Sequence, residues 1–188
     1  MKRALDVSVS VLLLVVCSPI LLVIMTAIRL QSPGAAIFRQ ARVGQNGLAF
    51  TCYKLRTMYA GTANLPTHEV AALSVTPLGR FLRQFKIDEL PQLWNVLTGD
   101  MSLVGPRPCL PSQNELVEAR RRLGVFEIRP GITGLAQVNG VDMSDANRLA
   151  EMDAHYVRTR SLIGDLRLLI ATLRGQGVGV DQVIRSRK

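Results

Sequence analysis

Cysteine and aromatic residues are scarce in this sequence of 188 residues. The three cysteines, Cys17, Cys52 and Cys109, lie far apart and form no C-x-x-C pair. This spacing excludes a disulfide framework and a cysteine-ligated zinc site, and it fits a protein of a reducing compartment. Aromatic residues make up 5% of the chain although 48% of it is hydrophobic, so the core is expected to be mainly aliphatic.

The signature motifs of several enzyme classes are absent as well. The sequence contains no glycine-rich P-loop with its lysine, no complete dinucleotide fingerprint, no H-E-x-x-H and no D-x-D. These absences exclude P-loop nucleotide hydrolases, metalloproteases of the H-E-x-x-H type and metal-dependent glycosyl transferases of the D-x-D type.

Basic residues outnumber acidic ones, and most of them are arginine. The chain has a net charge of +9, and 19 of its 23 basic residues are arginine. Because a guanidinium group binds phosphate oxygens through two N–H groups at once, this composition favours phosphorylated or anionic partners, although genome composition is an alternative explanation. A nucleic-acid partner would rest on charge alone, whereas basic residues beside a hydrophobic segment favour anionic lipid.

One long segment carries no charge at all. Val7 to Ile28 are 22 uncharged residues, and as a helix they would reach about 33 Å, which is enough to match a bilayer. The segment is longer than the apolar part of a signal peptide, so we expect it to be retained, although residues 32–36 resemble a cleavage region.

The topology of this segment is ambiguous from charge and proline placement. Basic residues flank both of its ends, Lys2 and Arg3 on one side and Arg29 on the other, so the rule that positive charge stays in the cytoplasm selects neither orientation. Ser18 and Pro19 predict a bend, because proline removes one amide donor and the serine hydroxyl can bond a freed carbonyl. A re-entrant helix-break-helix and a kinked spanning helix both fit.

The rest of the chain predicts one domain that is mainly α-helical within an α+β class. Turn residues at 44–47 between apolar runs predict a small β-hairpin, and residues 59–76, including His68, predict an exposed loop. Residues 77–87 predict an amphipathic basic helix that rests either on the membrane surface or on the core. The helices predicted after it cover 91–99, with Leu93, Trp94 and Leu97 buried, then 111–123, with solvated arginines at 120–122, and 144–173, with a break at Gly164, before a loosely held tail.

Asp88 and Glu89 form the only adjacent acidic pair in the chain. One interpretation makes Asp88 a helix cap. The other makes the pair the nucleophile and the metal ligand of a phosphoryl transfer, because a carboxylate can form a mixed anhydride with phosphate. The cations that could surround the phosphate are Lys54, Arg56, Arg83, Arg107 and Arg129.

Several ordered motifs resemble the bacterial sugar transferase family, the monotopic phosphoglycosyl transferases. The motifs are KLRTM at 54–58, GRFLR at 79–83, DELPQLWNVL at 88–97, GDMSLVGPRP at 99–108, RPGITG at 129–134 and D-x-x-Y-V at 153–157. The match covers nearly the whole chain. It departs from the family at Lys86-Ile87, where Ser-Leu is usual, and at Arg160, where an aromatic residue is common.

The resemblance implies a membrane enzyme of the bacterial cytoplasmic (inner) membrane. Residues 1–30 would be a re-entrant helix broken at Ser18-Pro19, and residues 31–188 a catalytic domain on the cytoplasmic face. Asp88 would attack a UDP-sugar, releasing UMP, and polyprenyl phosphate, usually undecaprenyl phosphate, would then take the sugar phosphate to start glycoconjugate assembly.

The same resemblance implies roles for the charged residues and leaves an alternative. Mg²⁺ would bind near Asp88 or Glu89, and Lys54, Arg83, Arg107, Arg56 and Arg129 would contact phosphate or nucleotide. The chain would be a minimal member without further membrane helices or a leading soluble domain. The alternative from another functional class is an inactive, membrane-anchored scaffold of the same fold, and the sugar is not marked by any motif.

Overall fold

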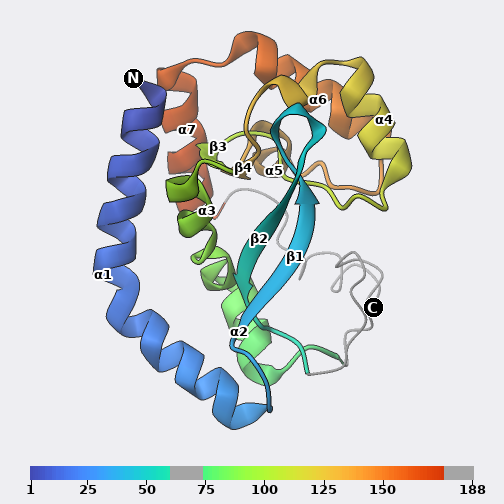
Figure 1. Cartoon of the computed structure of the whole chain (residues 1–188). Helices are drawn as coiled ribbons and strands as arrows, with labels where there is room; N and C mark the ends of the chain where they lie inside the picture. The colour runs from blue at the N-terminus through green and yellow to red at the C-terminus, as the bar shows by residue number, and fades with distance from the viewer. Residues whose placement is uncertain (60–73, 176–188) are drawn as a thin grey trace.

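The computed structural model describes residues 1–59 and 74–175. His68 and the predicted loose tail lie outside these ranges. Within them the chain is mainly helical with two small sheets, as predicted for an α+β protein (Figure 1). The elements in chain order are α1 (Lys2–Gln31), β1 (Ile37–Val43), η1 (Gln45–Gly47), β2 (Ala49–Leu55), α2 (Pro77–Gln84), η3 (Ile87–Glu89), α3 (Gln92–Thr98), β3 (Ser102–Val104), α4 (Asn114–Arg122), η4 (Val125–Glu127), β4 (Gly131–Thr133), α5 (Leu135–Val138), α6 (Ala146–Thr159) and α7 (Leu162–Leu173).

Helix α1 runs without interruption through Ser18 and Pro19. The predicted helix break is therefore a bend within a continuous helix, which Figure 1 shows halfway along α1. The reason is local: Pro19 cannot donate to the carbonyl of Val15, four residues earlier, and the Ser18 hydroxyl donates to that carbonyl instead at 2.8 Å. The hydroxyl satisfies the freed acceptor, so the helix continues.

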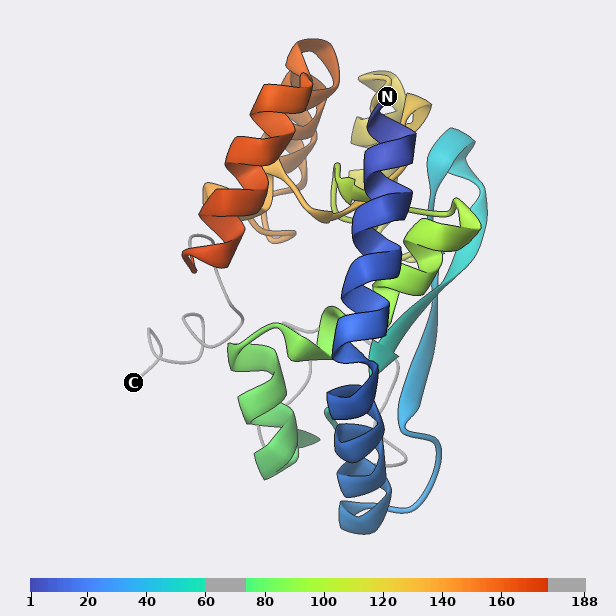
Figure 2. The same ribbon diagram turned by 90° about the vertical axis from the view of Figure 1, so that its left-hand side faces the viewer.

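Most of α1 is not covered by the other described elements. It is the one helix in the described ranges that is long and apolar enough to cross a membrane, and only 6% of its most apolar window is buried. Figure 2 shows this face toward the viewer, with no other element in front of it. Leu12, Val16 and Val23 are 62–69% exposed, which is unusual for so long an apolar run in water.

The amino end of α1 is tied to three other elements by polar contacts. Lys2 forms an ion pair with Asp165 of α7. Arg3 donates to two carbonyls at the carboxyl end of α3. The buried Asp6 accepts from the Ser102 hydroxyl at 2.8 Å and from the backbone amide of Leu103. A carboxylate so buried is stable only with such donors, so these contacts fix the start of α1.

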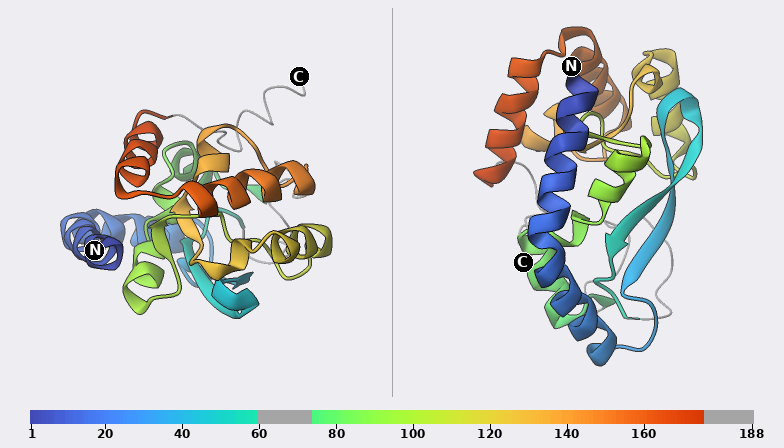
Figure 3. Two further views of the ribbon diagram at one scale, coloured as in Figure 1. Left: turned by 90° about the horizontal axis from the view of Figure 1, so that it is seen from above. Right: turned by 60° about the vertical axis from the view of Figure 1, so that its left-hand side comes forward.

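The predicted β-hairpin is confirmed. β1 and β2 are antiparallel, with Ile37 opposite Leu55 and Val43 opposite Ala49. The turn between them contains Asn46 and Gly47 in the left-handed region, at φ 58° and 74°, which turn residues of this kind tolerate. Helix α3 lies between α1 and the hairpin (Figure 3), and the buried Asn95 joins α3 to β2 by donating to Thr51 O and accepting from Tyr53 N.

The second sheet pairs β3 and β4 in parallel, with Ser102 opposite Gly131 and Val104 opposite Thr133. The chain after β3 passes so close to β4 that side chains are excluded. A Cβ atom at Gly131 would lie 2.1 Å from the backbone nitrogen of Gly105. The packing therefore requires the glycines of the 129–134 loop. Their close contact holds residues 106–108, which follow β3, in place.

Helices α2 and α3 begin and end near the predicted residues, but their burial differs. Thr76 caps α2 by accepting from Gly79 N at 2.9 Å, and Gly99 ends α3 at φ 96°. The prediction that Trp94 is buried is wrong, because Trp94 is 55% exposed. Phe81 of α2 and Phe85, which follows α2 directly, are 52% and 58% exposed. Helical periodicity finds an apolar face but not what covers it.

Two predictions in the carboxyl-terminal half are also corrected. Arg120 was expected on a solvated face but is 1% exposed, because α4 packs on α6 and presents Arg120 to Asp153. The helical segment breaks at Arg160-Ser161 rather than at Gly164. Ser161 caps α7 by accepting from Gly164 N at 3.1 Å. Because a serine at the N-cap position begins a new helix, Gly164 lies in the first turn of α7 and not at the break.

Candidate active site

Asp88 and Glu89 lie in the short turn η3, between α2 and α3. Lys86 precedes the turn in the left-handed region, at φ 56°, a conformation that non-glycine residues adopt at a cost. At Lys86 the chain turns from the end of α2 toward the start of α3, and the Lys86 carbonyl accepts from Glu89 N at 3.2 Å. The backbone thus places two adjacent carboxylates between the helices.

Glu89 is the carboxylate that the cations hold directly. Its Oε1 accepts from Lys54 Nζ at 3.2 Å and from Arg107 Nη2. Lys54 comes from β2, and Arg107 comes from the proline-flanked segment after β3. Burial acts to raise the pKa of Glu89, but the charges and hydrogen bonds of Arg107 and Lys54 outweigh it, so this pKa lies far below its ordinary value.

Asp88 behaves in the opposite way. Burial and the neighbouring charge of Glu89 raise the pKa of Asp88 to about 6, although Lys54, Arg83 and Arg107 act to lower it. The two carboxylates therefore separate into one that is always charged and paired and one that is poised near neutral pH. Asp88 is ionised at pH 7 and has no ion pair that would block it as a nucleophile among the described contacts.

Arg83 completes the group of cations around the dyad. It lies on α2, and its Nε donates to the Thr57 hydroxyl at 2.9 Å. Its charge acts on Asp88 together with those of Lys54 and Arg107. The structure therefore brings three of the five predicted phosphate-binding residues to the dyad, from α2, β2 and the segment after β3.

Arg56 and Arg129 have different partners. Arg56 donates to the carbonyls of Ile28, Ser32 and Pro33 around the carboxyl end of α1. Arg129 donates through Nε to the Gly99 carbonyl at 2.7 Å, just past the carboxyl end of α3. Neither is among the largest charge effects on the pKa values of Asp88 and Glu89, and the hydrogen bonds of both arginines lead to backbone carbonyls rather than to the dyad.

The sequence profile of the family described as bacterial sugar transferase matches residues 1–176. This chain belongs to the bacterial sugar transferase family. It is 42% identical over 183 residues to the UDP-glucose:undecaprenyl-phosphate glucose-1-phosphate transferase of Caulobacter vibrioides, covering 92% of this chain and 68% of that protein.

Two further relatives differ in how much of their length this sugar transferase spans. It is 39% identical over 186 residues to the undecaprenyl-phosphate glucose phosphotransferase of Komagataeibacter xylinus, covering 92% of this chain but 35% of that protein. It is 41% identical over 180 residues to the uncharacterized sugar transferase EpsL of Bacillus subtilis, covering 93% of this chain and 86% of that protein. The family identifies the chain as a transferase.

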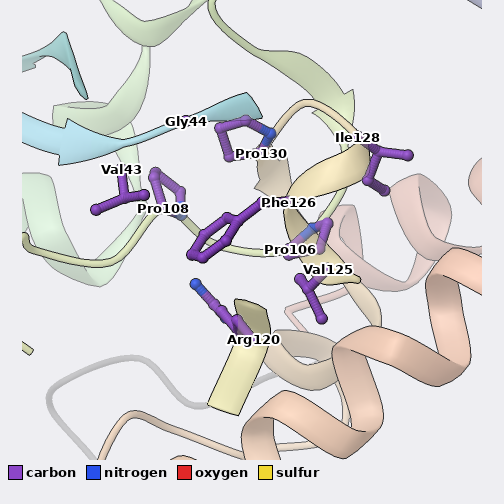
Figure 4. Close-up of a pocket in the computed structure, with 9 residues that line it drawn as sticks. All are labelled: Val43, Gly44, Pro106, Pro108, Arg120, Val125, Phe126, Ile128 and Pro130. Carbon is purple, nitrogen blue, oxygen red and sulfur yellow. The ribbon is translucent and has the colours of Figure 1, made fainter. Parts of the chain in front are cut away.

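The sequence motifs of this sugar transferase did not reveal the residue that supports Arg107. Arg120 donates to the backbone carbonyl of Arg107 at 2.8 Å and to Asp153 at 2.6 and 3.0 Å. Figure 4 shows the small cavity beside Pro106 and Pro108, with Arg120 at its edge. The sequence did contain a sign that Arg120 is buried, because Leu116 and Arg120 are four residues apart and so share one helix face.

The dyad of this sugar transferase suits a divalent cation only in part. Within residues 1–59 and 74–175 no group of three or more His, Cys, Asp or Glu could hold a metal. Mg²⁺, however, is often held by one or two carboxylates together with substrate phosphates and water. Asp88 and Glu89 offer two adjacent carboxylates, so their chemistry fits a Mg²⁺ ion that is bound jointly with a phosphorylated substrate.

Proposed function

We propose that this protein is a membrane-embedded phosphoglycosyl transferase. It moves a sugar 1-phosphate from a UDP-sugar to polyprenyl phosphate, usually undecaprenyl phosphate, releases UMP, and starts glycoconjugate assembly. The observation that carries the proposal is an ionisable Asp88 that lies beside three cations and forms no ion pair within residues 1–59 and 74–175. Relatives named as undecaprenyl-phosphate glucose-1-phosphate transferases from Caulobacter vibrioides, Klebsiella pneumoniae and Escherichia coli support this substrate class.

The chemistry divides into two displacements at the same phosphorus. An Asp88 carboxylate oxygen attacks the sugar-bearing phosphorus of the donor, the bond from this phosphorus to the bridging oxygen breaks, and UMP leaves with that oxygen. An oxygen of the polyprenyl phosphate then attacks the phosphorus, and the bond to Asp88 breaks to regenerate the carboxylate. Lys54, Arg83 and Arg107 stabilise the negative charge that is concentrated on the phosphoryl oxygens.

Glu89 keeps the cations in place before the donor arrives. Its single oxygen Oε1 is shared by Lys54 and Arg107, and the donor phosphates compete with it for the same N–H groups. Asp88 and Glu89 are the residues that would hold Mg²⁺, which supplies further neutralisation of phosphate charge when bound.

The attachment of α1 supports a re-entrant arrangement on the cytoplasmic face of the bacterial inner membrane. Its amino end is joined to α3 and β3 through Arg3 and Asp6. Its carboxyl end is joined to β2 through Arg56, and Ile28 is buried there. A spanning helix would put its ends on opposite sides of about 30 Å of hydrocarbon, whereas here both ends belong to one body. Residues 1–30 would then form the membrane part and residues 31–188 the catalytic domain.

Exposed aromatic side chains support the same placement. Phe81 of α2 and Phe85, which follows α2 directly, pack against each other with ring centroids 4.9 Å apart, yet both are more than half exposed, as is Trp94 of α3. Tryptophan favours the membrane–water interface, and amphipathic helices that lie in the interface carry Trp, Phe and Leu on their apolar face. The amphipathic helix α2 would therefore rest on the membrane surface next to the dyad.

The helix-cap interpretation of Asp88 is not supported. Pro91 occupies the N-cap position of α3, and neither α3 nor η3 has a side-chain cap among the described hydrogen bonds. An inactive scaffold would therefore keep Asp88 beside the largely buried Glu89, among cations, without a structural use for Asp88. Burying a carboxylate lowers the stability of a protein unless hydrogen bonds or ion pairs compensate for the loss of water.

The experiment is a turnover assay with a matched variant. The protein in lipid vesicles is incubated with undecaprenyl phosphate, Mg²⁺ and a panel of UDP-sugars, and UMP release is measured. Asp88→Asn should lose activity by at least about 10³-fold, since an amide cannot act as the nucleophile. Asp145→Asn is the control, because Asp145 caps α6 away from the dyad and asparagine caps equally well. Equal turnover by wild type and Asp88→Asn would show the mechanism to be wrong.

A further inference from the structure

Arg56 makes three hydrogen bonds to backbone carbonyls where α1 ends. Its Nη1 donates to Pro33 O at 2.7 Å, and its Nη2 donates to Ser32 O at 2.5 Å and to Ile28 O at 3.3 Å. The last carbonyls of a helix have no partner within the helix and carry partial negative charge. Ile28 O is one of these carbonyls and also accepts from Ser32 N, whereas Ser32 and Pro33 follow the helix. The guanidinium group therefore joins Arg56 to the last turn of α1 and to the turn after it.

The turn after α1 is shaped around this guanidinium group. Gly34 lies at φ 107°, and a Cβ atom on it would stand 2.6 Å from Arg56 Nη1. The backbone amide of Arg56 also donates to Ala36 O at 2.8 Å. Below the turn Ile28, Leu55 and Leu82 are at most 3% exposed and pack in one cluster. The contact is therefore part of a packed junction rather than a loose surface pair.

The same stretch of chain reaches the catalytic dyad. Lys54, two residues before Arg56, contacts Glu89, and Thr57, one residue after it, accepts from Arg83. Two residues of extended chain span about 7 Å. Residues 54–57 therefore connect the end of the membrane helix, two of the three phosphate-binding cations and the dyad over a short distance.

We propose that Arg56 is a positioning residue that fixes the carboxyl end of α1 relative to Asp88. This inference rests on the proposed function, in which the acceptor phosphate lies at the membrane surface and the donor comes from water. Because α1 is held by the bilayer, its attachment to residues 54–57 sets the depth at which Asp88 meets the lipid phosphate. A soluble donor needs no such alignment.

Loss of the contact should therefore separate the two half-reactions. Lysine at position 56 keeps the charge but has one nitrogen in place of the planar guanidinium, whose Nη1 and Nη2 reach separate carbonyls. Small misplacements of reacting groups can lower rates by up to about 10²-fold. For Arg56→Lys we expect transfer from Asp88 to undecaprenyl phosphate in vesicles to slow about tenfold or more, while adduct formation with donor alone stays within about twofold of wild type.

The experiment measures each half-reaction alone. Adduct formation is followed by intact mass and UMP release with donor and no acceptor, and adduct decay is followed after mixing with vesicles that contain undecaprenyl phosphate. A short-chain polyprenyl phosphate dispersed in water serves as a second acceptor, and its rate should be restored in Arg56→Lys because it needs no alignment with the bilayer. Arg39→Lys on the paired strand is the matched control, since Arg39 is exposed and contacts only the Tyr53 ring among the described contacts.

A second variant covers the case in which Arg56→Lys does not fold. Gly34→Ala pushes on the guanidinium group without altering it, and it should show the same selective loss. If either folded variant slows adduct formation as much as transfer, Arg56 acts on the donor phosphate and the positioning role is wrong. Wild-type transfer rates in both variants would overturn it as well. If wild type itself forms no adduct, the proposed function fails first, and that result appears before any variant is compared.

Discussion

The pH dependence of adduct formation should report the ionisation of Asp88. Only the carboxylate form attacks, and the pKa of Asp88 is raised to about 6 by burial and by Glu89. About nine tenths of Asp88 is then ionised at pH 7 and about one tenth at pH 5, so the rate of adduct formation should fall roughly tenfold between these values. The pKa of Glu89 lies far below this range, so Glu89 stays charged throughout.

Two substitutions should move this acid limb in opposite directions. Glu89→Gln removes a negative neighbour and frees the charges of Lys54 and Arg107, so the pKa of Asp88 should fall toward its ordinary value of about 4. Arg83→Gln removes a positive neighbour, so the pKa should rise above about 6. Each rate is compared with the same variant's own plateau at high pH, so that a general loss of activity does not obscure the shift.

The assay is single-turnover adduct formation, measured by mass between pH 4.5 and 8 with donor in excess. Glu118→Gln serves as the control, because Glu118 is an exposed carboxylate on α4 that pairs only with Arg121 among the described residues, and its profile should match wild type. A wild-type rate that is flat from pH 5 to 7, or shifts of the same sign in Glu89→Gln and Arg83→Gln, would refute this account of the dyad.

Two further predictions concern stability. Arg120→Met leaves Asp153 buried and without its cation, so it should lower the free energy of unfolding, measured by heat or denaturant, by about 3–5 kcal/mol. The double variant Arg120→Met/Asp153→Leu should recover most of that loss. A free energy of unfolding for Arg120→Met within about 1 kcal/mol of wild type would contradict the prediction. Gly131→Ala places a Cβ atom 2.1 Å from Gly105 N, so it should separate β3 from β4 and lower both the unfolding temperature and turnover. Gly47→Ala, whose Cβ atom meets nothing within 4 Å, should lower the free energy of unfolding only by roughly 1 kcal/mol, the cost of a left-handed residue. Equal losses of stability in the two variants would show that Gly131 and Gly105 are not tightly packed.

Patterns that depend on short-range chemistry could be predicted from the sequence. The hairpin, the start of α2 at Pro77 and the end of α3 at Gly99 follow from proline and glycine preferences that act within a few residues. The role of Ser18 beside Pro19 is of the same kind, because the freed carbonyl is only one turn away. These features need no knowledge of what packs against them.

Partners that are distant in sequence could not be predicted in the same way. Arg56 and Arg107 are equally basic in the sequence, but one contacts backbone carbonyls and the other contacts Glu89. Arg120 was expected to be solvated because it belongs to a run of three arginines, of which only Arg121 and Arg122 are exposed in the structure. Trp94 shows what helical periodicity cannot predict. Periodicity places Trp94 on the apolar face of α3 but does not reveal whether another part of the protein covers that face, and Trp94 is exposed.

The contacts at the amino end of α1 determine the order in which the molecule can assemble. Arg3 and Asp6 contact Val96 and Ser102, which lie about half a chain further along, and Lys2 contacts Asp165, 163 residues further along. Such long loops close slowly. We therefore expect the amino end of α1 to dock on the catalytic body late in folding, after α3, β3 and α7 have come together.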